Sequence, residues 1–526
     1  MNTKAFGIDL GTTHSVLAHL DHSGKPVVVR NAVDEEITPT AVYFEAPLEV
    51  MIGGAAKNSA VLEPRNYCEL VKRHMGSPGV RYPHHGHSYS PVEISALVLR
   101  YLAECGRRAT GVAVEDVVIT VPAHFGIAER EATRAAGEIA GLTVRDVIVE
   151  PVAAALHYGL GRADAGVRHV LVCDLGGGTC DTTVIRFEGD LVQVVCTGGD
   201  GALGGADWDA RVRDHLVDEF VRQHPRTDPT ADDVFMNDVV QRAELLKKEL
   251  SSAQTRHTEL RFRGAVARVE LTRATLDELT ADLVGRVVDL TRRTVEEAAR
   301  KGVREFDDVL LVGGMTKSPA IAAALRAELG LDPRSHEPHL AVAKGAAIFA
   351  AQRQVRIREE RRAAGISADK AATTAAVVPR SVGVKALDPS DPMVEVDVRK
   401  ARFIVQHLLI AGETLPAKSD TYQFAVVFAK ARMAEIEVWE QNPGEDSMDL
   451  STNRVVGKGF LRDMPPKPKG AVILVWFAMS ATGELSVHAS DPDSSAQVRF
   501  DLRIDGLTEP DVSRSRDWIT RHRLRD

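Results

Sequence analysis

Two short segments of this chain follow the same pattern, and they constrain its fold more than any other feature. IDLGTTHS (Ile8–Ser15) and CDLGGGTCD (Cys173–Asp181) each contain an apolar run, an aspartate, a turn rich in Gly and Thr, and a returning β-type run. Two β-type runs joined by a tight turn form a β-hairpin. A duplicated hairpin of this kind predicts two similar lobes that face each other.

Both turns are suited to bind phosphate. Glycine has no Cβ, so consecutive backbone N–H groups in such a turn can surround an anion. The turns also carry hydroxyl donors at Thr12, Thr13 and Thr179. Three carboxylates would repel a bound phosphate unless a cation such as Mg²⁺ lies between them: Asp9, Asp174 and Asp181. The alternative is two ordinary hairpins with aspartate-capped turns, but the repetition favours a nucleotide site.

The first 350 or so residues alternate between strand and helix patterns, which is typical of an α/β architecture. The expected strands include Phe6–Leu10, Asp116–Val121, His169–Asp174, Val184–Phe187 and Asp308–Val312. The expected helices include Glu129–Ala140, Trp208–Gln223, Asn237–Ser252 and Ala274–Lys301. We therefore expect an α/β domain over residues 1–352.

The rest of the chain has a different pattern. Residues 353–378 are first highly charged and then rich in Ala and Thr, which predicts a helical extension and a linker without a strand. Residues 379–505 contain short alternating runs separated by Pro and Gly turns, which predict an all-β sandwich. For residues 506–526 we expect a short tail, without a helical lid, whose basic stretch Arg521–Arg525 is solvated.

Composition disfavours several function classes. The net charge of -9 argues against a nucleic-acid-binding surface. The longest apolar run, Ala471–Met479, is about half the length of a membrane-spanning helix, and no signal peptide follows Met1. We therefore expect neither nucleic acid nor a membrane as a partner. Five cysteines without a CxxC pair are typical of free thiols in a reducing compartment, which predicts a cytoplasmic location.

Two further motifs do not indicate a site, and one common nucleotide-binding motif is absent. A solvent-exposed loop is favoured over a metal site for three histidines that lack a fourth ligand nearby: His84, His85 and His87. A GxGxxG motif is not followed by the strand and acidic residue of a dinucleotide fold: Gly199, Gly201 and Gly204. The chain has no GxxxxGK[ST] motif, which excludes a P-loop ATPase.

Eight segments together resemble the DnaK-type chaperones of the heat-shock protein 70 family, and they occur in that family's order. They are IDLGTTHS, VKRHMG (Val71–Gly76), VVITVPAHF (Val117–Phe125), EPVAAALHYGL (Glu150–Leu160), CDLGGGTCD, LGGADWD (Leu203–Asp209), ELLKKELSSAQ (Glu244–Gln254) and VLLVGGMTKSP (Val309–Pro319). The resemblance covers residues 1–350. It implies an actin-like, ribonuclease H-like fold with ATP in the cleft between the lobes, and an ATP-dependent chaperone that hydrolyses ATP.

The resemblance also implies roles for individual residues. Four residues would have catalytic roles. Lys72 would face the γ-phosphate, and Glu150 and Asp181 would orient the attacking water. Thr179 is the fourth. Those that bind ATP or ADP are Gly11, Thr12, Thr13, Gly176, Gly177, Gly178, Gly204, Gly205, Glu244, Lys247, Lys248, Ser251, Gly313, Gly314 and Lys317. Asp9, Asp174 and Asp181 would hold Mg²⁺ largely through water. Pro122 and Arg130 match the family's switch proline and its partner arginine, which couple the nucleotide to the second domain.

Some positions depart from the family pattern. Lys317 replaces an arginine, which removes planar stacking on adenine. His339 replaces an aspartate and Ala206 a glutamate, so we expect hydrolysis with altered nucleotide affinity. The linker segment 372–376 has Thr and Ala where the family has leucines and an aspartate. Because that removes apolar area, we expect weak docking between the domains.

The β-rich module resembles the family's peptide-binding sandwich more weakly, and an insertion, Leu387–Phe403, replaces a short loop. The resemblance implies unfolded or extended polypeptides as partners, together with a J-domain co-chaperone and a nucleotide exchange factor. Asp146 stands where the family has a basic residue used for J-domain docking. Two alternatives are an ATP-binding scaffold whose β-module holds one dedicated partner and, less favoured because no sugar pocket is implied, a sugar kinase.

Overall fold

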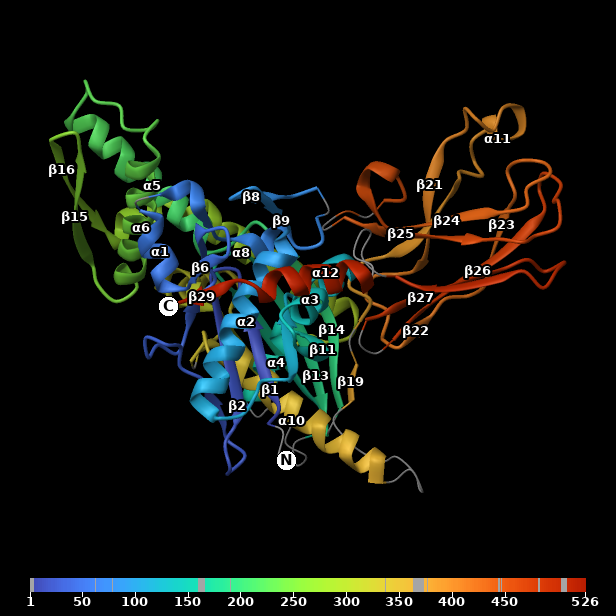
Figure 1. The fold of residues 1–526 in the computed structure, drawn as a ribbon, viewed down its shortest axis with the longest axis horizontal. Helices are drawn as coiled ribbons and strands as arrows, with labels where there is room; N and C mark the ends of the chain where they lie inside the picture. The colour runs from blue at the N-terminus through green and yellow to red at the C-terminus, as the bar shows by residue number, and fades with distance from the viewer. Residues whose placement is uncertain are drawn as a thin grey trace.

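The computed structural model describes residues 4–61, 63–77, 79–158, 166–189, 191–335, 337–362, 373–375, 377–442, 445, 447–480, 483–502 and 509–526. These residues form a two-lobed α/β domain and a β-rich module beside it (Figure 1). None of the helices within these ranges is long and apolar enough to cross a lipid bilayer.

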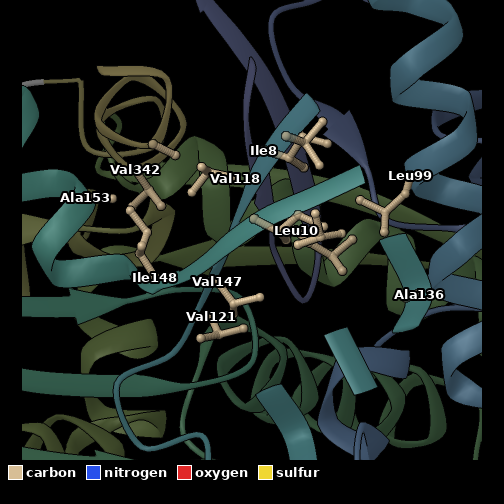
Figure 2. Close-up of a cluster of buried hydrophobic side chains, with 14 of the residues drawn as sticks. Ile8, Leu10, Leu99, Val118, Val121, Ala136, Val147, Ile148, Ala153 and Val342 are labelled. Atoms are coloured by element: carbon tan, nitrogen blue, oxygen red, sulfur yellow. The ribbon is translucent and has the colours of Figure 1, made fainter. Parts of the chain in front are cut away.

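The first lobe is built on a six-stranded mixed sheet. Its strands are β11 (Thr143–Val149), β10 (Asp116–Val121), β1 (Phe6–Leu10), β2 (His14–Leu20) and β3 (Pro26–Val28), in that order, with β4 (Thr38–Pro39) beside β2. The first three strands are parallel, and β2 and β3 continue the sheet antiparallel. Ile8 and Leu10 from this sheet pack near Leu99 and Ala136 of the helices that cover one face, whereas Val118 lies on the other face near Val342 (Figure 2).

Those two helices are α2 (Pro91–Thr110) and α3 (Ile127–Ile139). Local sequence explains where α2 begins and ends. Ser90 and Glu93 form a reciprocal capping box at its start, with Pro91 in the first turn, and Gly111 ends it in the left-handed conformation.

The second lobe repeats the strand order of the first. Its sheet contains β18 (Pro333–Arg334), β17 (Asp308–Val312), β12 (Arg168–Leu175), β13 (Cys180–Glu188), β14 (Leu191–Asp200) and β19 (Thr373–Ala375). Again, the first three strands are parallel and the next two antiparallel. The duplicated motif therefore corresponds to two similar lobes, as predicted.

Two helices pack between the lobes. In α4 (Glu150–His157) and α10 (Ala341–Arg362) the backbones touch at Gly345, where an added Cβ would lie 1.7 Å from the carbonyl oxygen of Ala153. Only glycine permits this approach. The charged run after residue 352 continues α10 as a helix, as expected.

Each lobe carries an outer subdomain. One contains β5 (Val42–Ala46), β6 (Glu49–Ile52), α1 (Gly54–Ala60) and β7 (Tyr67–Cys68). The other has its own apolar core and contains α5 (Gly205–Gln223), α6 (Asp233–Leu250), β15 (Thr255–Phe262), β16 (Ala265–Thr272) and α7 (Arg273–Leu279). Two further helices lie in the second lobe, α8 (Ala281–Arg300) and α9 (Pro319–Leu329). The single helix expected over 274–301 is therefore two helices, because the backbone leaves the helical conformation at Thr280.

The β-rich module consists of two sheets around one core. One sheet contains β20 (Val382–Leu387), β21 (Phe403–Leu409), β24 (Ala434–Gln441) and β25 (Asn453–Leu461). The other contains β22 (Ala417–Lys418), β23 (Tyr422–Ala425), β26 (Val472–Met479), β27 (Leu485–Ser490) and β28 (Gln497–Asp501). Buried side chains from both sheets, such as Val384 and Val475, share one cluster. The insertion before β21 contains a short helix, α11 (Met393–Val396).

The linker differs from the expectation. Residues 373–375 form strand β19, which extends the second lobe's sheet parallel to β14 (Figure 1). Weak docking between the domains stays a prediction, whereas the expectation of a strandless linker is not what the structure shows. The reason is that strand pairing uses backbone groups, which are present whatever the side chains are. Residues 372 and 376 lie outside the described residues.

The end of the chain also differs from the expectation. Residues 509–526, which we call the C-terminal strap, form α12 (Glu509–Thr520) and β29 (Arg523–Arg525). Helix α12 lies on α2 and α3 of the first lobe, and β29 pairs parallel with β6 (Figure 1). The expected solvated basic tail is therefore a helix and a strand bound to the first lobe.

Specific contacts fix the strap in place. Arg100 of α2 donates hydrogen bonds to the carbonyl oxygens of Ile519 (2.7 Å) and His522 (2.8 Å), which lie at the C-terminal end of α12. The Ile519 side chain is fully buried. Trp518 stacks on His87, with ring centroids 4.7 Å apart, and Tyr89 is hydrogen-bonded to His522.

The histidine-containing segment 84–87 packs under this strap and onto β5. His84 is buried and stacks on Phe44, with ring centroids 4.3 Å apart, and His87 is half-buried under Trp518. The expectation of a solvent-exposed loop holds for His85 alone among the three.

Candidate nucleotide-binding site

A cavity of about 360 Å³ lies between the two lobes, and most of the residues predicted from the sequence line it. Those that do are Asp9, Gly11, Thr12, Thr13, Lys72, Glu150, Asp174, Gly176, Gly177, Thr179, Gly205, Glu244, Lys247, Lys248, Ser251, Gly313, Gly314 and Lys317. Five predicted residues lie elsewhere: Pro122, Arg130, Gly178, Asp181 and Gly204.

The two Gly/Thr turns meet face to face at this cavity. A Cβ on Gly177 would lie 2.0 Å from the Oγ1 of Thr13, and a Cβ on Gly178 would lie 2.3 Å from the Cγ2 of Thr12. Larger residues would push the turns apart. The glycines therefore bring the threonines of one lobe against the backbone of the other, which leaves small groups and peptide dipoles on the cavity wall.

A third glycine-rich segment supports the second turn from behind. The N–H of Ala206 donates to the carbonyl oxygen of Gly177 (2.8 Å), and a Cβ on Gly204 would lie 2.4 Å from the backbone nitrogen of Gly178. Gly204 therefore holds the turn and does not face the cavity, whereas Gly205 does. Lys247 donates to the carbonyl oxygen of Gly205 and pairs with Asp209.

Buried carboxylates from both lobes face one another at the strand ends. Burial, and then the neighbouring Glu150, raise the pKa of Asp9 to about 7, while Lys72 acts in the opposite direction. Burial, followed by the repulsion of Glu150 and Asp181, raises the pKa of Asp174 well above its usual value. These shifts mean that Lys72 does not fully compensate the negative charge of the carboxylates, and a hard cation would supply the remaining positive charge.

The donor set fits Mg²⁺, which binds oxygen ligands and usually keeps several of its waters. Within the described residues no three His, Cys, Asp or Glu side chains are close enough to form a direct metal cage. Magnesium held largely through water, as predicted, does not need such a cage. Asp9 and Asp174 are the residues that would face it.

Lys72 enters the cavity from a short 3-10 helix, Val71–His74. Its Nζ lies 2.6 Å from Oε1 of Glu150, the first residue of α4, and both side chains are buried. The next residue, Arg73, donates to the carbonyl oxygen of Gly178 and pairs with Asp207 (2.6 Å), so it ties the 3-10 helix to the second turn. Lys72 is thereby positioned as a fixed positive charge.

Asp181 lies behind the cavity and makes contacts that sequence reasoning missed. It pairs with Asp174 across the β12–β13 hairpin. Its Oδ1 accepts hydrogen bonds from the backbone N–H (3.1 Å) and the Nδ1 (2.8 Å) of His124. His124 lies within the VPAHF segment, but nothing in the sequence indicates that it reaches this carboxylate.

The opposite wall of the cavity carries the residues of α6 that the family resemblance assigns to nucleotide binding. Glu244 pairs with Lys248 (2.7 Å) and, across the cleft between the two outer subdomains, with Lys57 of α1 (2.5 Å). Gly313, at a φ of 87°, lets the chain turn beside Asp174 and brings Lys317 to this wall. The predicted nucleotide-binding residues of α6 and of the segment after β17 therefore line the same cavity.

The cavity also contains residues to which the sequence analysis gave no role: His14, Asp209, Arg273 and Asp277. His339, which is expected to alter nucleotide affinity, lines it as well. Burial, and then the nearby Lys248 and Lys57, lower the pKa of His14 to about 3, so the imidazole is neutral at pH 7. In the sequence His14 directly follows the first turn, and this position is the feature that indicates a place in the cavity wall.

The family of this chain follows from its match to a family model. The family described as Hsp70 protein matches this chain over residues 5–79 and 76–514, which is nearly all of it. The chain belongs to the Hsp70 family. Hsp70 proteins are ATPases that bind ATP or ADP with Mg²⁺ and act as ATP-dependent chaperones on client polypeptides. The two α/β lobes and the β-rich module agree with the actin-like ATPase and β-sandwich of the family.

The two residues matched to the Hsp70 domain switch lie away from the cavity, toward the β-rich module. Arg130 is buried in α3, and its Nε donates to the carbonyl oxygen of Phe125, within one turn of Pro122. Burial lowers the pKa of Arg130 to about 10. The location suits a role in domain coupling, and the role itself stays a prediction.

Lys317 gives a prediction about nucleotide affinity in this Hsp70 protein. Replacing Lys317 by arginine should tighten ATP binding about two- to fivefold, because a planar guanidinium stacks on an aromatic ring better than an ammonium does. Isothermal titration calorimetry with ATP measures the change. The exposed Lys25 provides the matched control, Lys25→Arg. Equal affinities for Lys317→Arg and the wild type would show that residue 317 does not face the base.

Proposed function

We propose that this protein is a DnaK-type chaperone that hydrolyses Mg·ATP in the cavity between its lobes and uses the nucleotide state to control binding of extended polypeptide by the β-rich module. One observation carries the proposal. The buried Lys72–Glu150 pair and the carboxylates of Asp9 and Asp174 converge between two turns of phosphate-binding type.

The residues of the cavity explain how hydrolysis would proceed. Mg²⁺ would supply neutralisation of phosphate charge, and Asp9 and Asp174 would hold it. Lys72 is a buried, fixed cation that stabilises negative charge developing on the transferring phosphoryl group. Glu150, hydrogen-bonded to Lys72, can orient a water for attack. The chain itself therefore contributes positioning and electrostatics, and no covalent intermediate is needed.

The β-rich module supports the second half of the proposal. Several large apolar side chains of this module are exposed, among them Val396 (77%) at the end of α11 and, on the loop before β24, Phe428 (59%) and Met433 (48%). Exposed apolar groups on loops of a rigid sandwich suit an extended polypeptide that presents apolar side chains. Members of the family bind client polypeptides, so we propose clients of that chemistry.

We also propose a nucleotide exchange factor, a J-domain co-chaperone and a cytoplasmic location, the last supported by five free, buried cysteines. The J-domain contact would differ from that of the family. Asp146 is buried, and its carboxylate lies 3.8 Å from Arg353, so the position offers no basic group to a partner. A J-domain would therefore have to contact basic residues elsewhere on this protein.

Magnesium dependence gives a direct prediction. Replacing Asp174 by asparagine should weaken the Mg²⁺-dependent part of ATP binding by about tenfold or more, because it removes a charge-assisted contact. Calorimetry with ATP in Mg²⁺ and in excess chelator measures that part. Asp277→Asn removes a carboxylate from another wall of the same cavity and is the control. ATP affinity that is the same with and without Mg²⁺ in the wild type would contradict the assigned site.

One experiment tests the proposed function as a whole. Steady-state ATP turnover is measured with and without unrelated apolar peptides, and peptide dissociation is measured with ATP and with ADP. A chaperone should respond to several unrelated peptides and release them at rates that depend on the nucleotide. An ATP-binding scaffold with one dedicated partner would show neither response.

A further inference from the structure

The C-terminal strap is held to the first lobe by a histidine that its surroundings keep neutral. His522 connects α12 to β29 and is only 1% exposed. Its Nδ1 lies 3.1 Å from the carbonyl oxygen of Trp518, and its Nε2 lies 2.8 Å from the hydroxyl oxygen of Tyr89. Because a carbonyl oxygen can only accept a hydrogen bond, Nδ1 carries the hydrogen of the neutral ring. Nε2 is then an acceptor, and the O–H of Tyr89 donates to it.

A second proton on His522 would disturb this arrangement. It would occupy Nε2, so the O–H of Tyr89 would lose its acceptor. The guanidinium of Arg100 lies at the same end of α12, where it donates to the carbonyl oxygens of Ile519 and His522. A helix C-terminus favours a positive charge, but Arg100 already provides one. A charged imidazole would add a second, buried cation beside the first.

The docked imidazole of His522 is harder to protonate than a histidine in water. Burial lowers the pKa of His522 and outweighs the hydrogen bond to the Trp518 carbonyl, which raises it. The charges of Arg100 and His87 lower this pKa further. Once the strap leaves the lobe, the ring regains water and an ordinary pKa of about 6.5. The detached strap therefore binds a proton more readily than the docked strap.

His84 lies near the strap but does not depend on it. Burial, and then the neighbouring His85, lower the pKa of His84. Its ring stacks on Phe44, and its Nε2 lies 3.1 Å from the Sγ of Cys68. Both contacts are inside the first lobe, so they stay the same whether the strap is docked or detached.

His87 touches the strap directly, but its protonation would not oppose docking in the same way. Its ring stacks on Trp518, and within the described residues its Nε2 has no hydrogen-bond partner. Glu93 of α2 lies 3.9 Å from that nitrogen, so a proton there would gain an attractive charge and lose no contact. Arg523 of β29, the next residue after His522, is exposed. His522 is therefore the group whose protonation opposes docking.

We infer that the C-terminal strap is an acid-sensitive element: protonation of His522 releases α12 and β29 from the first lobe and opens the edge of β6. The inference goes beyond the proposed function and does not depend on ATP hydrolysis. Because the detached strap takes up the proton, docking is strongest above about pH 6.5 and weakens as the pH falls below that value. One such proton lowers the ratio of docked to detached strap by up to about tenfold between about pH 7.5 and 5.5.

Hydrogen exchange of the full chain at about pH 7.5 and 5.5 tests this directly. The reporters are the amides of α12 and the N–H of Arg523, which donates to the carbonyl oxygen of Leu48 (2.7 Å). Each rate is divided by the intrinsic rate at the same pH, so that only opening of the strap remains. We expect strap protection to fall about five- to tenfold and β10 protection to change by less than about twofold. Equal strap protection at both pH values, or an equal fall in β10, would overturn the inference.

Two histidine variants assign the effect to one ring. His522→Asn does not titrate, and its amide can still donate to the Trp518 carbonyl. The fall in strap protection between the two pH values should shrink to less than about twofold in this variant. His87→Gln is the matched control, because it removes the other histidine that touches the strap, and it should keep the full fall. A fall that persists in His522→Asn, or that disappears in His87→Gln, would contradict the assignment.

A second measurement covers the case in which His522→Asn abolishes docking. Nuclear magnetic resonance of the histidine rings in the wild type follows each imidazole through the titration, and the signal missing from the variant identifies His522. The docked ring should carry its hydrogen on Nδ1 at neutral pH and titrate with a midpoint below about 6.5. A midpoint at or above that value would show that docking does not oppose the proton, and the inference would fail.

Discussion

Replacing Lys72 by alanine should lower the rate of ATP hydrolysis by about a hundredfold or more while nucleotide binding is largely kept. Lys72 is buried, and its Nζ is held 2.6 Å from Glu150 at the cavity that the two turns form. A preorganised charge of this kind acts mainly where negative charge develops in the transition state, and removing one such group typically has an effect of that size. Single-turnover hydrolysis and ATP affinity, measured separately, give the two quantities.

Loss of stability must be separated from loss of catalysis, because the alanine variant leaves the buried Glu150 without its partner. The double variant Lys72→Ala, Glu150→Gln removes that unpaired charge. It should fold at least as well as the single variant and remain as slow or slower. Lys25→Ala, an exposed lysine distant from the cavity lining, is the control for turnover. Near-normal hydrolysis in Lys72→Ala would show that the assigned geometry is wrong.

Replacing Ile519 by alanine should lower the free energy of unfolding of the first lobe, including the strap, by about 2–5 kcal/mol. The reason is that the substitution leaves a cavity in a packed core. Ile519 is fully buried and belongs to the same cluster as Ile8 and Leu99, although it lies in the C-terminal strap. Urea unfolding with and without saturating ATP measures the loss. Hydrogen exchange of the amides in β6 reports whether β29 has detached.

Ile410 of the β-rich module is the matched control, since the same substitution there removes a half-exposed side chain. Ile410→Ala should change stability by no more than about 0.5 kcal/mol. If Ile519→Ala is equally mild and leaves the protection of β6 unchanged, the strap does not support the first lobe.

The parts of the fold that were predictable are those with strong local patterns. Strands β1, β10 and β17 begin and end at the predicted residues, because short apolar runs bounded by turns or acidic residues define them. The two turns were predicted from glycine, threonine and aspartate alone, and they line the cavity as expected. The nucleotide-binding residues of α6 were predicted from the family resemblance, and Glu244, Lys247 and Lys248 share one face of that helix because they stand at i, i+3 and i+4.

The parts that were missed depend on contacts between distant segments. Strand β29 is only three residues long, reads Arg-Leu-Arg, and pairs with residues more than 470 positions earlier. Strand β19 has the sequence Thr-Thr-Ala, which contains no apolar strand pattern, and its pairing with β14 uses backbone groups. Nothing in the sequence around His124 indicates that it contacts Asp181, because only the folded chain brings the two residues together. Local periodicity contains none of this information.

The position of β29 has a consequence for how the protein is made. The sheet β7–β5–β6 consists of residues from the first seventh of the chain, yet its last neighbour is Arg523–Arg525. A ribosome releases these residues more than 470 positions after β6, so β6 keeps an open edge while the residues between them are made. Synthesis therefore passes through a long stage in which the N-terminal lobe is nearly formed and incompletely covered. During that stage the chaperone is itself a nascent chain that other chaperones could bind.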